Sequence, residues 1–337
     1  TTLVFVNTRN MTETVVQKLK IAGLLGVEGH HGSMDKAIRL DVEQRLKNGY
    51  LRCVVSSSSL EMGIDIGSVD LVIQVGSPGS IATALQRIGR AGHQVGGLPR
   101  ARFLPISPHD LLELVALQTG ILRGSMDILK FPENCLDVLA QFLIGLSIIK
   151  EWDIDDAYDL ASASWPYRNL PYDDYIEVLD LLEDERRIWI DWEDNKFGKR
   201  GFAQMIYYTN IGTIAPNNNY LVFTSDGTMV GQLSSSFVSS LRNGDVFLLG
   251  GSTYRVSSIR GTRVNVSPAT GYRPTIPSWT GEANSRTHEL SQEVLELLEE
   301  VATYARLEKD PMTIFTDILG LNRPVAHAVS GFFQEHV

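Results

Sequence analysis

Cysteine is scarce in this sequence of 337 residues. Cys53 and Cys135 stand far apart and neither belongs to a C-x-x-C pair, which excludes a disulfide scaffold and a cysteine-rich zinc site. This usage fits a reducing cytoplasm, where we expect the protein to reside. The histidines are scattered, and the pair His30-His31 is better explained as a loop feature than as a metal site, so we expect no metal ligands here.

Long apolar runs are also missing. No stretch approaches the roughly 18 apolar residues that a membrane span needs, and no signal peptide opens the chain, so we expect no membrane partner. The hydrophobic fraction of 43% and the charged fraction of 21% are typical of globular proteins, and the length suggests two or three domains. Because the sequence starts within the apolar run Leu3-Val4-Phe5-Val6, we interpret it as part of a longer protein.

The third absence concerns nucleotide chemistry. No G-x-x-x-x-G-K-[ST] phosphate loop occurs anywhere, and no D-E-x-[DH] motif follows a strand. The loop that binds the ATP phosphates and the Mg²⁺ ligands would therefore have to lie in another part of the protein. We expect this chain alone not to hydrolyse ATP.

Charge is distributed unevenly along the chain. The net charge is -10, but residues 151–193 carry fourteen acidic side chains against three arginines, which leaves the rest of the chain about neutral. Residues 241–286 carry six arginines against Asp245 and Glu282. A polyanionic partner is therefore compatible with the sequence, and the basic segment is the better candidate to contact it.

The first hundred residues alternate between strand and helix patterns. Apolar runs at 3–6, 51–55 and 69–75 predict parallel strands buried on both faces, and residues 12–22 and 35–47 predict helices between them. This order indicates an α/β fold with right-handed crossovers. Ligands in such sheets lie at the carboxyl ends of the strands.

The remaining chain predicts two further kinds of structure. Helical patterns at 110–122, 134–149, 153–163 and 172–187 precede a strand at 188–192, a turn at 195–201 and a β-prone run at 204–208. This is the order of a winged helix, and Lys196, Lys199 and Arg200 would make its wing tip basic. Short β-prone runs between 220 and 277 predict a small barrel or sandwich, and residues 289–306 predict a helix.

The stretch Gln86-Arg87-Ile88-Gly89-Arg90-Ala91-Gly92 suits phosphate binding. Two arginines at i and i+3 on one helix face offer fixed forks of donors that match phosphate oxygens. An isolated R-x-x-R is more often a solvated helix face. Here a second motif, Ser56 to Asp65, precedes it between two buried strands.

With these motifs the chain resembles the second RecA-like lobe of superfamily 2 helicases. Gly63-Ile64-Asp65 resembles motif V and Gln86 to Gly92 motif VI, while Thr2 to Arg9 resembles motif IV and His31-Gly32-Ser33 the short motif after it. The landmarks at 60–65, 69–74, 78–81, 136–141, 271–274 and 279–282 narrow the resemblance to the large helicase-related (Lhr) family.

The resemblance implies a role for each motif residue. Arg90, with Arg87 and Gln86, would stabilise the γ-phosphate of ATP across a cleft, and Gly63 and Asp65 would line the nucleotide. Contacts with a single-stranded or tailed nucleic acid would come from residues of the lobe and of the basic segment (Thr8, Arg9, Ser33, Ser57, Arg255, Arg260 and Trp279).

The resemblance also implies an architecture and an activity. We expect a RecA-like lobe (1–107), a winged helix (108–208), a β-rich, barrel-like domain (209–286) and the start of a helical segment (287–337). The whole protein would be a 3′-to-5′ helicase that uses ATP and Mg²⁺, both bound mainly by a first lobe outside this chain. Two alternatives stay open: a Ski2-like RNA helicase, against which Trp279-Thr280-Gly281-Glu282 argues, and a non-catalytic nucleic-acid-binding scaffold that keeps a motor lobe.

Overall fold

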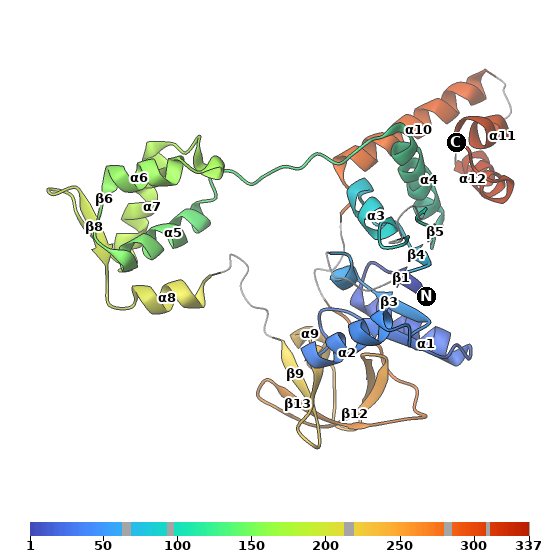
Figure 1. Ribbon diagram of the computed structural model, residues 1–337, viewed down its shortest axis with the longest axis horizontal. Helices are drawn as coiled ribbons and strands as arrows, with labels where there is room; N and C mark the ends of the chain where they lie inside the picture. Colours follow the sequence, from blue (N-terminus) through green and yellow to red (C-terminus); the bar gives the residue numbers. More distant parts are fainter. Residues whose placement is uncertain (63–68, 93–97, 212–218, 280–284, 308–310, 337) are drawn as a thin grey trace. The chain divides into compact units, whose positions relative to one another are not determined.

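The computed structural model describes residues 1–62, 69–92, 98–211, 219–279, 285–307 and 311–336 (Figure 1). The chain divides into two compact units. One unit combines Thr1–Ile128 with Asn218–Val337, and the other is Leu129–Asn217. Among the described residues, no helix combines the length and the apolar character needed to cross a membrane.

A parallel sheet opens the first unit. Its five strands lie in the order β2-β3-β1-β4-β5, and every neighbouring pair is parallel. The elements are β1 (Thr2–Phe5), α1 (Arg9–Ile21), β2 (Val27–His30), α2 (Lys36–Lys47), β3 (Cys53–Ser56), the short turn η1 (Ser58–Leu60), β4 (Leu71–Val75), α3 (Ile81–Ile88) and β5 (Ala101–Leu104). The predicted α/β class is confirmed, although β2 was not predicted because it is short and contains Glu28 and Gly29.

Both faces of this sheet are buried, as the apolar runs predicted. Leu3 and Phe5 pack on the face that α2 covers, whereas Val4 and Val6 pack on the face that α1 covers. Successive side chains of a strand point to opposite faces, so a strand covered on both sides is apolar at every position. Because β1, β2 and β3 are neighbouring parallel strands, the loops that follow them gather at one edge of the sheet.

A helical layer lies next to the lobe. It consists of α4 (Pro108–Arg123), α10 (His288–Arg306), the single turn α11 (Pro311–Thr313), the π-helical turn η3 (Ile314–Ile318) and α12 (Arg323–His336). In Figure 1, α4 runs beside α10, and their apolar side chains share one core that includes Val115, Leu297 and Phe315. The sequence assigned the first of these helices to the winged helix; the structure instead places it with the lobe because its apolar face packs on α3 and α10.

The second unit is the winged helix. It contains α5 (Leu136–Ile149), β6 (Trp152–Asp153), α6 (Ile154–Ser162), the turn η2 (Trp165–Tyr167), α7 (Tyr172–Asp184), β7 (Ile188–Asp191), β8 (Lys196–Lys199) and α8 (Ala203–Thr209). The three strands form a sheet in the order β6-β8-β7, and Tyr175 and Phe197 lie in the core between sheet and helices. The winged-helix class is confirmed, but the second hairpin strand, β8, lies in the segment that the sequence assigned to a turn.

Two details of the winged-helix prediction are wrong. The β-prone run at 204–208 is part of helix α8, where Ile206 and Tyr207 pack on the core around α5. Gly145 permits this contact, since a Cβ there would lie 2.7 Å from the Tyr207 ring. Tertiary packing has overridden local β propensity.

The wing tip is acidic rather than basic. Lys196 and Lys199 lie on strand β8, and the turn before them is closed by the amides of Glu193 and Asp194, which both donate to Asp191 Oδ1 at 3.1 Å. Arg200 lies 3.9 Å from the Glu183 carboxylate. Lys196 and Lys199 are exposed on β8 beside this turn, and the turn itself carries the acidic side chains of Asp191, Glu193 and Asp194.

An open β-sheet completes the first unit and confirms the β-rich prediction. Its strands, in the order β10-β9-β13-β12-β11, are antiparallel except for the pair β9–β13. The elements are β9 (Tyr220–Thr224), β10 (Met229–Leu233), the helical turn α9 (Ser235–Val238), β11 (Val246–Leu249), β12 (Ser252–Arg260) and β13 (Arg263–Pro268). The inner face of this sheet forms a core with Ile38 of α2 and Trp279 at its margin.

Candidate functional site

Arg87, near the end of α3, is the centre of a polar cluster. Its Nε and Nη2 donate to Glu61 Oε2 at 3.1 and 2.9 Å, and its Nη1 donates to Gln74 Oε1 at 2.8 Å. Asn7 Oδ1 lies 3.5 Å from the same Nη1, and the guanidinium lies over the Phe5 ring. Asn7 and Gln74 lie at the carboxyl ends of β1 and β4, so Arg87 ties together the loops at this edge.

This arrangement corrects one part of the sequence interpretation. The Arg87 side chain is only 2% exposed and its donors already have acceptors within the lobe, so it does not extend toward a nucleotide. The physical reason lies in the helix end. Helix α3 stops at Ile88, with Gly89 as its cap, and Arg90 lies in the turn that follows, where it is partly exposed while Glu61 and Gln74 hold Arg87 inside the lobe.

Arg90 and Gln86 are positioned differently from Arg87. Gln86 is exposed and Arg90 is partly exposed, at the end of a helix that Arg87 anchors to the sheet. Beyond them, Gly92 adopts a φ of +79°, and a Cβ there would lie 3.1 Å from the Pro99 nitrogen. Glycine is therefore required where the motif ends. The other predicted nucleotide residues, Gly63 and Asp65, lie outside the described residues.

Residues expected to contact nucleic acid meet at the carboxyl edge of the sheet. Arg9 follows β1, Ser33 follows β2 and Ser57 follows β3, and these three strands are neighbours. Arg9 Nη1 donates to Ser33 Oγ at 2.7 Å, so the structure brings this predicted pair into contact. The Thr8 hydroxyl instead caps α1 by accepting from the Met11 amide at 3.1 Å. Ser57 is buried and immediately precedes the η1 turn as its N-cap.

His30 connects the serine run after β3 to helix α2. Its Nδ1 lies 2.7 Å from Ser59 Oγ and its Nε2 lies 2.9 Å from Glu43 Oε1. Burial lowers the pKa of His30 below its ordinary value, and the hydrogen bond with Glu43 opposes that shift without cancelling it. The ring is therefore neutral near neutral pH, and it serves as a structural bridge between β2, α2 and the serine run.

Glu13 forms a second buried cluster that the sequence did not reveal. Its carboxylate accepts hydrogen bonds from His31 Nε2 and from the backbone amides of Gly250 and Gly251. The only sequence signal was its position four residues after Arg9, which places both on the same side of α1. This cluster joins the lobe to the β-rich sheet.

Of the residues in the basic segment that were predicted to contact nucleic acid, one lies on the inner face of the β-rich sheet and two lie on its outer face. Trp279 lies on the inner side of the β-rich sheet, with its ring centroid 5.5 Å from that of His31. Its indole N–H is buried and has no acceptor among the described residues. Arg255 and Arg260 lie instead on the outer face, because Val256 and Ile259 between them contribute to the core.

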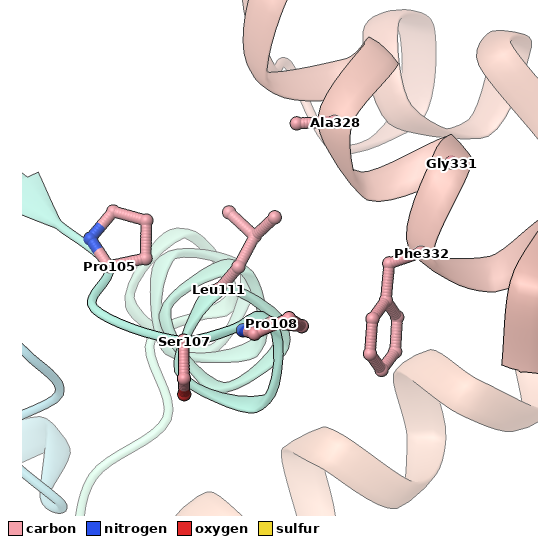
Figure 2. A pocket seen from close by; sticks show the side chains of 7 residues that line it. All are labelled: Pro105, Ser107, Pro108, Leu111, Ala328, Gly331 and Phe332. Atoms are coloured by element: carbon pink, nitrogen blue, oxygen red, sulfur yellow. The ribbon is translucent and has the colours of Figure 1, made fainter.

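A groove of about 430 Å³ lies elsewhere in the first unit, between the start of α4 and helix α12 (Figure 2). Leu111 and Phe332 border it from the two helices, and Ser107 provides a hydroxyl that caps α4. None of the described residues that line it has an ionisable side chain. The groove therefore offers packing surface and no groups for acid–base chemistry.

Comparison with known proteins agrees with this arrangement of motifs. Residues 1–94 match the helicase conserved C-terminal domain, and residues 119–276 match the winged helix domain of large helicase-related proteins. The chain is 41% identical over 354 aligned positions to the ATP-dependent helicase Lhr-Core of Methanothermobacter thermautotrophicus, covering 99% of this chain and 41% of that protein. It is 37% identical to the Lhr helicase/uracil glycosylase of Escherichia coli, covering 80% of this chain and 18% of that protein.

A solved structure gives the same result for the fold. The Mycobacterium smegmatis helicase Lhr, bound to single-stranded DNA and AMP-PNP, matches 99% of this chain and 41% of its own length, with a TM-score of 0.71 and 28% identity. The chain thus spans about two fifths of the Lhr-Core and mycobacterial relatives. The lobe, the winged helix and the β-rich sheet all occur in that match, and the chain belongs to the Lhr family of superfamily 2 helicases.

Proposed function

We propose that the protein containing this chain is an ATP-driven 3′-to-5′ translocase that unwinds DNA or RNA:DNA hybrids. The observation that carries the proposal is the end of α3, where Arg87 fixes the helix to the sheet, Gln86 is exposed and Arg90 is partly exposed. The first RecA-like lobe of the same protein, outside this chain, would complete the nucleotide site opposite them. Cytoplasmic location is part of the same proposal.

The side chains of this chain fit the phosphate part of ATP. Guanidinium groups match phosphate oxygens and cannot ligate a cation, so we assign Mg²⁺ to the first lobe. Bound ATP would supply the phosphoanhydride whose hydrolysis drives movement. Arg90 would neutralise charge on the transferred phosphoryl group, Gln86 would support its orientation, and Gly63 and Asp65 would line the nucleotide.

The tracked strand would pass the edge where Arg9, Ser33 and Ser57 meet. Contacts of this kind with the sugar-phosphate backbone fix position and carry no sequence information. We assign Trp279 to the same path, because its indole N–H has no acceptor among the described residues and its ring lies beside His31, two residues before Ser33. We assign Thr8 to the same strand-binding loop through its cap on α1.

Strand displacement by the full-length protein tests the proposal. Duplexes of DNA, RNA and hybrid composition, each with a 3′ or a 5′ tail, are incubated with and without ATP. We expect ATP-dependent displacement of DNA or hybrid duplexes that carry the 3′ tail. Equal displacement without ATP, or displacement only from 5′ tails, contradicts it.

The outer face of the β-rich sheet is a second proposed contact surface. Arg260 and Arg263 face each other directly across β12 and β13. Like charges in this position destabilise a strand pair, and no carboxylate among the described residues pairs with Arg255, Arg260 or Arg263. The Arg255 guanidinium lies 4.2 Å from the Tyr272 ring centroid and that of Arg263 lies 3.8 Å from Phe223. A nucleic-acid backbone would relieve this repulsion.

The double substitution Arg260→Gln/Arg263→Gln should weaken binding of single-stranded DNA in a salt-dependent way. Each phosphate contact on a single strand contributes about 0.7 to the slope of log K against log salt, so the slope should fall by about 1.4. Fluorescence anisotropy over a salt series measures it. The matched control, Arg52→Gln/Arg102→Gln, removes two exposed arginines from the parallel-sheet lobe and should leave the slope unchanged. Equal slopes for both pairs would exclude this face as a contact.

A further inference from the structure

The Glu13 carboxylate is buried at the junction between helix α1 and the β-rich sheet. Its Oε1 accepts hydrogen bonds from His31 Nε2 at 2.9 Å and from the Gly250 amide, and its Oε2 accepts from the Gly251 amide at 2.8 Å. A buried charge is costly unless several donors satisfy it. Glu13 is satisfied only when α1, the loop after β2 and the β11–β12 turn are all in place.

The turn that receives Glu13 is shaped for a carboxylate. Gly250 and Gly251 have φ values of +61° and +72°, a conformation that points successive amides toward one anion. A Cβ on Gly251 would lie 3.2 Å from Val16 Cγ1 and 3.1 Å from Lys20 Nζ. Both the backbone conformation and the close approach of α1 therefore favour glycine here.

His31 connects this turn to the loop that follows β2. Its Nδ1 accepts from the Ser33 amide at 3.2 Å, so the ring proton lies on Nε2, from which it is donated to Glu13. Ser33 is also held from the other side, because its carbonyl accepts from the Gln232 amide at 2.7 Å. Its hydroxyl accepts from Arg9, which lies one turn before Glu13 on α1.

We propose that Glu13 is a positioning residue for nucleic-acid binding. By fixing His31 against the Gly250-Gly251 turn, it holds Ser33 and Arg9 in the geometry that contacts the strand backbone. The β-rich sheet is then a structural part of the strand-binding edge. This inference rests on the proposed function, since it names what orients the residues that the proposal assigns to the tracked strand.

Glu13→Gln in the full-length protein is the direct test. Glutamine keeps the shape but offers one acceptor oxygen, and its amide group would face amide donors, so the loop loses a fixed partner. We expect the Kd for single-stranded DNA to rise about tenfold, the scale of one lost hydrogen bond to a charged group. Affinity for AMP-PNP should not change. Lys20→Met is the matched control, because Lys20 donates to the same turn at the Gly251 carbonyl and does not touch His31; its Kd should equal that of the parent.

The double substitution Glu13→Gln/Ser33→Ala separates positioning from general stabilisation. If both residues act through one loop, the double variant binds no more weakly than the worse single variant. A lowered melting temperature with parental DNA affinity, or additive losses, overturns the inference. Should Glu13→Gln fail to fold, Glu13→Asp keeps the charge on a shorter stem, and parental affinity in that variant overturns it equally. A parent protein that binds no single strand would instead overturn the proposed function.

Discussion

Arg90→Ala in the full-length protein should lower kcat for ATP hydrolysis about 10³-fold or more, while ATP affinity changes little. Charge on the transferred phosphoryl group is greatest in the transition state, so a guanidinium supplied to it acts mainly on kcat. A 10³-fold loss corresponds to about 4 kcal/mol of transition-state stabilisation. Steady-state hydrolysis with saturating nucleic acid gives kcat, and titration with AMP-PNP gives the affinity.

Two further variants define what the Arg90 result means. Arg90→Lys keeps the charge and loses the planar fork, so its kcat should remain much closer to that of Arg90→Ala than to the parent. Arg102→Ala removes an exposed arginine of strand β5 and should hydrolyse ATP at the parental rate. Parental kcat in Arg90→Ala would remove this residue from the catalytic role and would favour the scaffold alternative.

The sequence predicted the parallel lobe well because its strands are buried on both faces. Continuous apolar runs such as residues 3–6 are typical of strands that helices cover on both sides, and Leu3, Phe5 and Val6 are all fully buried. The edge where Arg9 and Ser33 meet was also predictable, since residues that follow neighbouring parallel strands must gather there. The structure brings these two side chains into contact, and their role in binding nucleic acid stays a prediction.

The sequence predictions that were wrong or missing share one physical cause, which is tertiary contact with distant parts of the chain. The spacing of Arg87 and Arg90 predicted that both would face a ligand, but Glu61, 26 residues earlier in the chain, holds Arg87 inside the lobe. Residues 204–208 have β propensity, but the surface of α5 offers a groove at Gly145 that a helix fits. Glu13 went unnoticed because its two backbone donors lie in a glycine turn more than two hundred residues away.

Arg87→Met should destabilise the lobe rather than act on the chemistry alone. Methionine fills the space over Phe5 but leaves the Glu61 carboxylate, 14% exposed, and the Gln74 side chain without their shared donor. Removing one partner of a largely buried ion pair costs about 3–5 kcal/mol. For a unit of this size that corresponds to a fall of roughly 10 °C in Tm, measurable by calorimetry or circular dichroism.

The same variant distinguishes the two roles considered for Arg87. If Arg87 contacts the nucleotide, Arg87→Met should be stable but impaired in ATP hydrolysis. If Arg87 instead anchors the polar cluster, Arg87→Met should lose stability, and the double variant Arg87→Met/Glu61→Leu should partly regain it. That rescue follows because a buried ion pair replaced as a unit by apolar side chains is often neutral in stability. If Arg87→Met keeps the parental Tm and the double variant is no more stable, the ion pair does not anchor α3. Gln86 and Arg90 would then not be held in place by Arg87. The proposal of an ATP-driven translocase would lose the observation on which it mainly depends.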